Sequence, residues 1–138
     1  MKSHNNTKSI TILFIAILLS TASVNAQEIK KEKWEAPEEA NLLINPLTEN
    51  SQSLKEGKKL YKQQCVVCHG DSGKGDGVAG LALSPKPASF SSENFKNESD
   101  GAIFWKISNG RSPMAAYKDI LTEEQRWLLI TYIRSISK

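Results

Sequence analysis

The most regular hydrophobic pattern lies near the middle of the chain, where residues 54–64 repeat an apolar or small side chain every three or four positions. This spacing predicts a helix with one face toward a core. Ser53 and Glu56 have the spacing of a capping box, so the helix is expected to begin at Leu54. Gly57 lies on the apolar face. Because glycine is a poor helix former, we expect it there to allow the close approach of another helix.

A second helix is predicted near the end of the chain. Residues 123–135 form a broad apolar surface, as a buried terminal helix needs. Thr122 and Gln125 repeat the capping-box spacing, and the two acidic residues between them lie in the first turn, where the helix dipole favours negative charge.

A shorter helix is predicted between these two. It runs from Asp100 toward Gly110, with Ser99 or Asp100 as its cap and Gly110 as its stop. No segment shows a convincing strand-like alternation, and the chain has no internal repeat. The predicted fold class is therefore all-α.

The chain begins with polar and basic residues, followed by the apolar run 10–19 and by small residues up to Ala26. This layout predicts a signal peptide over residues 1–26 that is removed after Ala26, and hence an exported, periplasmic protein. The alternative is that the uncleaved signal stays as a membrane anchor. A run of about ten apolar residues is short against the roughly twenty that a spanning helix needs.

Residues 27–52 are rich in charge, contain Pro37 and Pro46, and show no sustained period. They predict an irregular polar N-terminal arm on the surface, which Trp34 is the candidate to dock onto the body. The remaining residues, 53–138, form the predicted globular domain.

The 138 residues leave room for one small domain beside the leader and exclude a two-domain enzyme. The net charge of +3 overstates the basic character, because the leader holds two of the 18 basic residues and none of the 15 acidic ones. Without the leader the net charge is +1, which offers no electrostatic argument for a nucleic-acid partner.

The two cysteines of the chain, Cys65 and Cys68, are three positions apart, and His69 follows directly. This is the attachment signature of a c-type haem, because two thiols one helical turn apart reach two vinyl groups of one porphyrin and the histidine offers its imidazole to the iron. A dithiol oxidoreductase shares the cysteine spacing but expects a strand before it and a mixed sheet around it. A zinc site expects four cysteine or histidine ligands, and only three remain without the leader. A structural disulfide would leave the adjacent histidine unexplained.

Met114 is the candidate for the other side of the iron. It is the one methionine outside the leader and follows Pro113, while His69 is the one histidine outside the leader. Two-histidine ligation within the chain is thereby excluded. A methionine that fills a gap in the core is the other interpretation. A thioether opposite the imidazole favours electron transfer over oxygen chemistry.

These residues together resemble the class I cytochromes c, particularly the short exported bacterial type with one haem. The resemblance covers residues 53–135 and rests on the Cys65–His69 motif, the glycine-rich loop 73–77, the segment 100–105, Gly110 with Met114, and the last helix. It implies three to five short helices around one covalently attached haem c per chain. Cofactor-binding residues would be Cys65, Cys68, His69 and Met114, of which His69 and Met114 bind the metal.

The resemblance also implies two contacts within the fold. The first and last helices are expected to cross at nearly right angles, with Gly57, Tyr61, Leu129 and Tyr132 at the matching places. A backbone carbonyl between Val78 and Pro87 is expected to accept a hydrogen bond from the second nitrogen of the histidine.

The resemblance implies a one-electron carrier and not an enzyme. Its partners would be redox proteins, such as a quinol-oxidising complex, a dehydrogenase or a terminal oxidase, met through a small transient interface. We expect a monomer that touches a membrane only through an uncleaved signal or through membrane-bound partners. The alternatives are a haem-based enzyme or ligand sensor with an open sixth position, and an exported dithiol oxidoreductase.

Overall fold

The computed structural model describes residues 33–138; the predicted signal peptide and the first residues of the predicted arm lie outside the described residues. The elements in chain order are η1 (Glu38–Leu42), α2 (Ser51–Gln64), α3 (Val66–His69), η2 (Gly80–Ala82), α4 (Glu93–Lys96), α5 (Asp100–Asn109) and α6 (Glu123–Ile136). Within residues 33–138 no strand forms, and the β-type pairing there is one isolated bridge between Arg111 and Met114. The predicted all-α class is confirmed.

The start of α2 differs from its prediction. The cap is Asn50, whose side chain accepts hydrogen bonds from the backbone N–H groups of Gln52 and Ser53, and the helix begins at Ser51 instead of Leu54. Ser53 is therefore the third helical residue, and its hydroxyl accepts from the backbone N–H of Asn50 at 2.9 Å. Glu56, the predicted partner of a Ser53 cap, is bound by the side chain of Gln52. Asparagine caps a helix as well as serine does, so the capping box forms one turn earlier.

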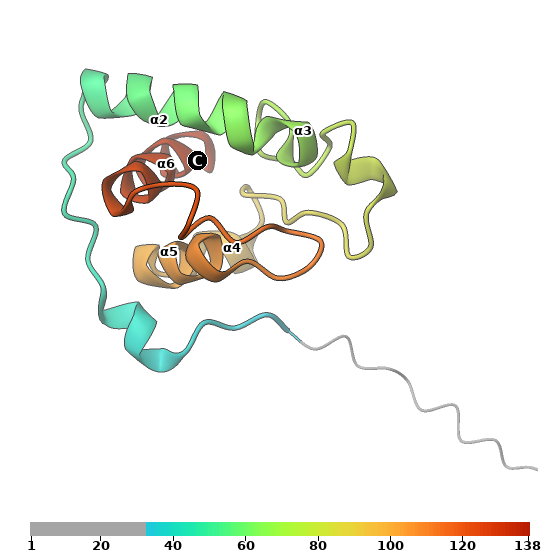
Figure 1. The fold of residues 1–138 in the computed structure, drawn as a ribbon, viewed down its shortest axis with the longest axis horizontal. Helices are drawn as coiled ribbons and strands as arrows, with labels where there is room; N and C mark the ends of the chain where they lie inside the picture. Colours follow the sequence, from blue (N-terminus) through green and yellow to red (C-terminus); the bar gives the residue numbers. More distant parts are fainter. Residues whose placement is uncertain (1–32) are drawn as a thin grey trace, which may run out of the picture. The chain divides into compact units, whose positions relative to one another are not determined.

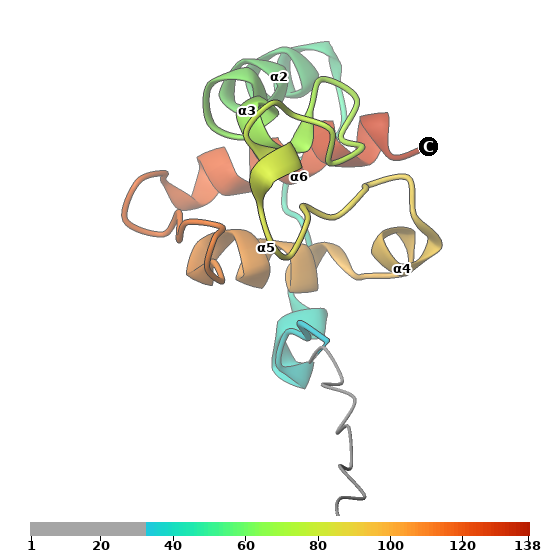
Figure 2. The ribbon, with the colours of Figure 1, turned by 90° about the vertical axis from the view of Figure 1, so that its right-hand side faces the viewer.

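The helices α2 and α6 cross steeply. Figure 1 shows α2 along its length and α6 nearly end-on, and Figure 2 shows α6 along its length. Gly57 makes the approach possible, because a Cβ atom there would collide with the backbone oxygen of Leu128 and with the Cβ of Tyr132. The rings of Tyr61 and Tyr132 meet across the crossing, with centroids 5.3 Å apart. The predicted role of Gly57 is confirmed.

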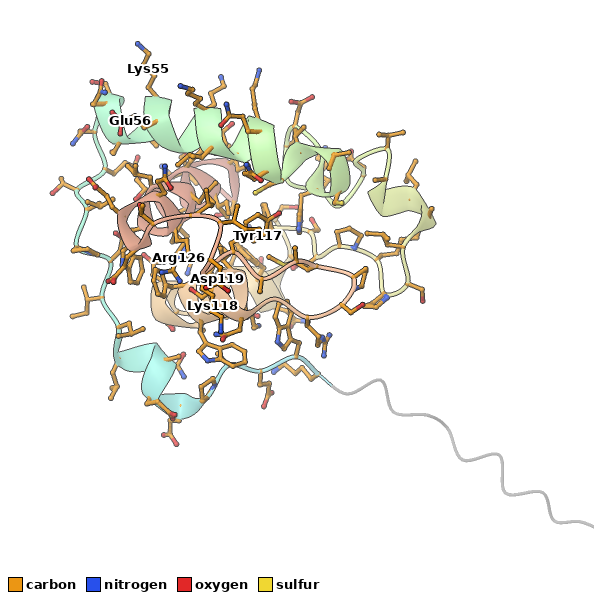
Figure 3. The ribbon with its side chains drawn as sticks, in the orientation of Figure 1. Lys55, Glu56, Tyr117, Lys118, Asp119 and Arg126 are labelled. Atoms are coloured by element: carbon orange, nitrogen blue, oxygen red, sulfur yellow. The ribbon has the colours of Figure 1, made fainter. Side chains whose placement is uncertain are left out.

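The hydrophobic core lies where α2, α5 and α6 meet. Tyr61, Leu129 and Ile130 are its most deeply buried large side chains. Trp127 of α6 stacks on Phe104 of α5, with ring centroids 4.1 Å apart. By contrast, Lys55 on the opposite face of α2 points away from the body (Figure 3).

The predicted starts of α5 and α6 and the predicted end of α5 are confirmed. Thr122 caps α6 through a capping box with Gln125, and Ser99 caps α5 by accepting from the backbone N–H of Ala102 at 3.0 Å. Gly110 ends α5 with a φ of 61°. No helix within residues 33–138 combines the length and the apolar character needed to cross a bilayer.

The described part of the arm is more ordered than an irregular segment. It contains the 3-10 helix η1, whose Ala40 is buried. Ala40 and Leu43 lie so close to Gly101 that a Cβ atom on this glycine would collide with their backbone oxygens. Asn41 accepts a hydrogen bond from the Ser99 hydroxyl at 2.7 Å. The arm is thus fixed against the start of α5, which a reading of hydrophobic periodicity could not detect because the contact uses small side chains and backbone.

Candidate haem site

The turn that holds Cys65, Cys68 and His69 follows α2 without an intervening loop. The backbone N–H of Cys65 donates to the Tyr61 oxygen at 2.8 Å, and that of His69 donates to the Cys65 oxygen at 2.9 Å. Cys65 and Cys68 are three positions apart on this helical path, so both thiols lie on one side of it. Both cysteines are free and partly buried.

Burial, with a smaller contribution from Cys68, raises the pKa of the Cys65 thiol to about 12. A reactive dithiol needs the opposite, a thiolate stabilised by a lowered pKa. Within residues 33–138 there is also no strand before the motif and no sheet around it. This environment does not fit an exported dithiol oxidoreductase.

The imidazole of His69 is held from one face by Phe90. The two rings stack with centroids 4.7 Å apart and an interplanar angle of 22°. Burial lowers the pKa of His69, and the backbone of Ala88 opposes this with a smaller raising effect. The ring is therefore neutral at ordinary pH, which is the form that binds metals. Its Nδ1 atom is buried, and no hydrogen bond to it forms among the described residues.

The backbone that acts on His69 lies one residue beyond the predicted range. A backbone group that raises the pKa of an imidazole is an acceptor, so the carbonyl of Ala88, just outside the range from Val78 to Pro87, lies near the ring, although the buried Nδ1 makes no hydrogen bond among the described residues. The reason lies in the segment that follows: the backbone N–H of Phe90 donates to the Gly73 oxygen at 2.7 Å and draws residues 88–90 toward the histidine.

The glycine-rich loop after His69 closes tightly on the turn. Gly73 has a φ of 68°, and a Cβ atom there would collide with the Phe90 ring. The backbone N–H of Gly75 donates to the His69 oxygen at 2.9 Å, and that of Gly77 to the Cys68 oxygen at 3.2 Å. The buried hydroxyl of Tyr61 donates to the Gly70 oxygen at 2.6 Å. Loop and turn thus form one unit that fixes the histidine.

Met114 lies on a different segment, the connection between α5 and α6. It is partly buried and packs against the same hydrophobic core that Cys65 borders. The backbone N–H of Met114 donates to the Arg111 oxygen at 2.8 Å, and that of Arg111 donates to the Met114 oxygen at 3.1 Å. The structure thus brings Cys65, Cys68 and His69 together in one turn, and places Met114 on another segment that borders the same core.

Two residues of the site were not found from the sequence. Tyr117 lies on the α5–α6 connection (Figure 3), and its hydroxyl donates at 2.9 Å to the backbone oxygen of Gln64, the residue before Cys65. Burial raises the pKa of Tyr117, with smaller contributions from Cys65 and Cys68, so the hydroxyl stays protonated. Phe90 is the other. Tyr117 could have been found from the sequence as an aromatic residue three positions after Met114. Phe90 gives no such signal, because it lies in a turn-rich segment without hydrophobic periodicity.

The residues present fit a covalently attached haem. The turn offers two free thiols on one side of a helical path and, directly after them, an imidazole whose lowered pKa keeps it in the neutral form that binds metals. A zinc ion fits less well, since within residues 33–138 no three histidine, cysteine or acidic side chains gather into a group that could hold a metal.

Comparison with solved structures agrees with this fold. A chain of the Kuenenia stuttgartiensis reducing HAO-like protein complex Kustc0457/Kustc0458 is similar with a TM-score of 0.60 and 28% sequence identity, over 67% of this chain and 47% of that one. This chain thus spans about half the length of that one. The KustC0563 c-type cytochrome is similar with a TM-score of 0.50 and 30% identity, over 59% of this chain and 98% of that one.

The comparison with protein families covers the helices and the site together. Residues 52–133, more than half of the chain, match the family described as cytochrome C oxidase, cbb3-type, subunit III. This range includes nearly all of α2, the Cys65–His69 turn, Met114 and most of α6. The chain therefore belongs to this family of c-type cytochromes.

Proposed function

We propose that the protein is an exported one-electron carrier with a single haem c, working in the periplasm between a redox donor and a terminal acceptor. The observation that carries the proposal is the Cys65–His69 turn, with its two free thiols and the adjacent neutral imidazole. Family membership, which implies covalently bound haem c, also supports it.

Each residue has a separate task in this proposal. Cys65 and Cys68 would hold the haem through thioether bonds, and His69 and Met114 would bind its iron. When bound, the haem supplies a one-electron couple at its iron, with a potential that a methionine ligand raises. The Phe90 ring holds the imidazole in one orientation. Met114, as the second protein ligand, would keep outside ligands from the iron.

An exposed apolar surface next to the turn supports docking of a redox protein. Val67, Val78 and Leu81 are 50%, 80% and 60% exposed, and the backbone N–H of Ala79 joins their segments by donating to the Val67 oxygen at 2.9 Å. Lys86 reaches this surface through a hydrogen bond to the Leu81 oxygen. A small apolar patch with a basic residue at its edge suits a brief encounter with a partner of opposite charge.

Visible spectra and the mass of protein matured with haem-attachment factors test the proposal. We expect the mass of the processed chain plus one haem, a low-spin spectrum and, in the oxidised state, a methionine-to-iron charge-transfer band. A high-spin spectrum would instead favour the enzyme or sensor with an open sixth position. Colourless protein that titrates two thiols would favour the dithiol oxidoreductase. N-terminal sequencing of exported protein, with Gln27 as the expected first residue, tests the signal peptide.

One observation favours a second role, as the haem subunit of a larger redox assembly. A structural relative at 28% identity is a chain of a redox protein complex. The native mass of the protein purified from its own cells separates the roles, because a free carrier elutes as a monomer and a subunit elutes with its partners.

A further inference from the structure

We propose that the N-terminal arm acts as a clasp on the methionine side of the haem site. Trp34 of the arm holds the side chain of Arg111, and through it the turn that contains Met114. The inference rests on the proposed function in one respect, the assignment of Met114 as an iron ligand. In this role Trp34 is a positioning residue.

The described part of the arm has a fixed position on the body. Ala40 is buried against Gly101 at the start of α5, where only a residue without a side chain fits. Asn45 donates a hydrogen bond to the Thr131 hydroxyl of α6 at 3.1 Å. Leu47 packs on the hydrophobic core. The arm therefore contacts α5, α6 and the core, and these contacts fix the segment that follows Trp34.

Trp34 contacts two cationic side chains of the body. Its ring centroid lies 5.6 Å from the Lys106 ammonium of α5 and 5.0 Å from the Arg111 guanidinium. Lys106 also forms a 2.5 Å ion pair with Glu98 and is itself mostly buried, so its end of this contact is anchored on the body. Cations at such distances are attracted to the face of an indole ring.

Arg111 and Met114 lie at the two ends of one short turn. Their backbones exchange two hydrogen bonds, of 3.1 and 2.8 Å, which close a short turn. The turn is tied to α5 before and after it, by the N–H of Gly110 on the Lys106 oxygen and the N–H of Tyr117 on the Ile107 oxygen. Between these ties, Arg111 and Met114 move as one unit, so a restraint on the guanidinium also restrains the methionine.

The clasp limits how often Met114 moves away from the haem site. An excursion of the turn must break the contact between Arg111 and Trp34, which adds to the cost of opening. Loss of the indole should therefore raise the open population roughly fivefold, the ratio that corresponds to about 1 kcal/mol.

The experiment uses the matured, oxidised holoprotein and imidazole as an external ligand for the iron. We expect Trp34→Ala to bind imidazole roughly fivefold more tightly and to exchange the Met114 amide proton faster by a similar factor. Trp34→Phe, which keeps a weaker ring, should lie between the two proteins. Leu42→Ala alters an exposed side chain on the same arm and should change neither quantity.

A double-mutant cycle separates the clasp from general loosening. If Trp34 acts through Arg111, the double variant of Trp34→Ala and Arg111→Gln should bind imidazole no more tightly than the tighter of the two single variants. Additive effects would overturn the clasp. Should Trp34→Ala fail to fold, Trp34→Phe and Arg111→Gln provide the same cycle.

The two proposals fail in different ways. If Met114→Ala opens the iron to imidazole but Trp34→Ala does not, the clasp is wrong and the electron carrier stands. If Met114→Ala changes neither imidazole binding nor the charge-transfer band, Met114 is not the ligand, and both the ligand assignment and the clasp fall.

Discussion

The turn with Cys65, Cys68 and His69 takes its shape from nearby residues, whereas the segment with Met114 is held from distant parts of the chain. On the histidine side, the backbone N–H groups of Cys65, His69 and Phe90 donate to the oxygens of Tyr61, Cys65 and Gly73 in turn, all within residues 61–90. On the methionine side, α5 restrains the segment from nearby, and further restraints come from Trp34 and Gln64, which lie far away in sequence. A local turn closes little chain, while distant contacts need the whole fold first. We therefore expect the segment with Met114 to open more easily than the turn with His69.

The strongest test removes one haem-binding residue from each side. Cys68→Ala should abolish nearly all haem attachment through two thioether bonds, because the second thiol has no substitute in the chain. Met114→Ala should keep the haem covalently attached but lose the charge-transfer band and lower the midpoint potential. Mass spectrometry and redox titration measure the two. A Met114→Ala protein with an unchanged potential would contradict the division between the sides.

Phe90 tests the packing of the histidine side. Its ring is 5% exposed and contacts His69, Tyr61 and Phe95, so Phe90→Ala should lower the free energy of unfolding by about 3 kcal/mol. Guanidinium denaturation of the holoprotein measures it. Val78→Ala, a truncation at an exposed position of the same region, is the matched control with almost no expected effect. Equal effects for the two variants would show that Phe90 does not support the histidine.

Gly57 tests the helix crossing on which both sides rest. The methyl group of Gly57→Ala would collide with the backbone of Leu128, and we expect a loss of about 2 kcal/mol even though alanine is the better helix former. Lys58→Ala, on the exposed face one position later, should be nearly neutral. Thermal unfolding of both variants checks this. A stabilised Gly57→Ala protein would mean that α6 can move away at no cost.

Tyr117 gives the smallest and most selective effect. Tyr117→Phe removes one hydrogen bond, to the Gln64 oxygen, and should cost about 1 kcal/mol of stability. Because that bond joins the methionine segment to the residue before Cys65, amide exchange should rise at residues 111–117 and stay unchanged in α3. Hydrogen exchange measured by NMR gives both values. A larger rise of amide exchange in α3 would show instead that the histidine side opens more easily.

Much of the fold could be predicted because its signals act over one or two turns of chain. Thr122 with Gln125, Ser99 and Gly110 set the helix ends through hydrogen bonds to their own neighbours, and these boundaries were right. The start of α2 was wrong because two neighbouring residues, Asn50 and Ser53, are both good caps, and their ranking depends on how the preceding chain enters the helix.

The site divides in the same way. The pattern of Cys65, Cys68 and His69 is a local spacing, and the structure places the three in one turn as their sequence predicts. The carbonyl facing His69 could be placed only to within one residue, because the backbone pairing of Phe90 with Gly73 decides it. The contact of Tyr117 with Gln64 spans 53 positions, and no local pattern encodes such a distance.

By itself, the order of residues determined the all-α class, the main helices and the three residues of the haem motif, because spacing and capping are properties of neighbouring residues. Tertiary structure alone decided where the arm lies, that Trp34 meets Arg111, and which segments restrain Met114. The physical reason is that these contacts depend on steric fit between distant segments, such as Ala40 against the bare backbone of Gly101, and such a fit exists only once the helices have packed.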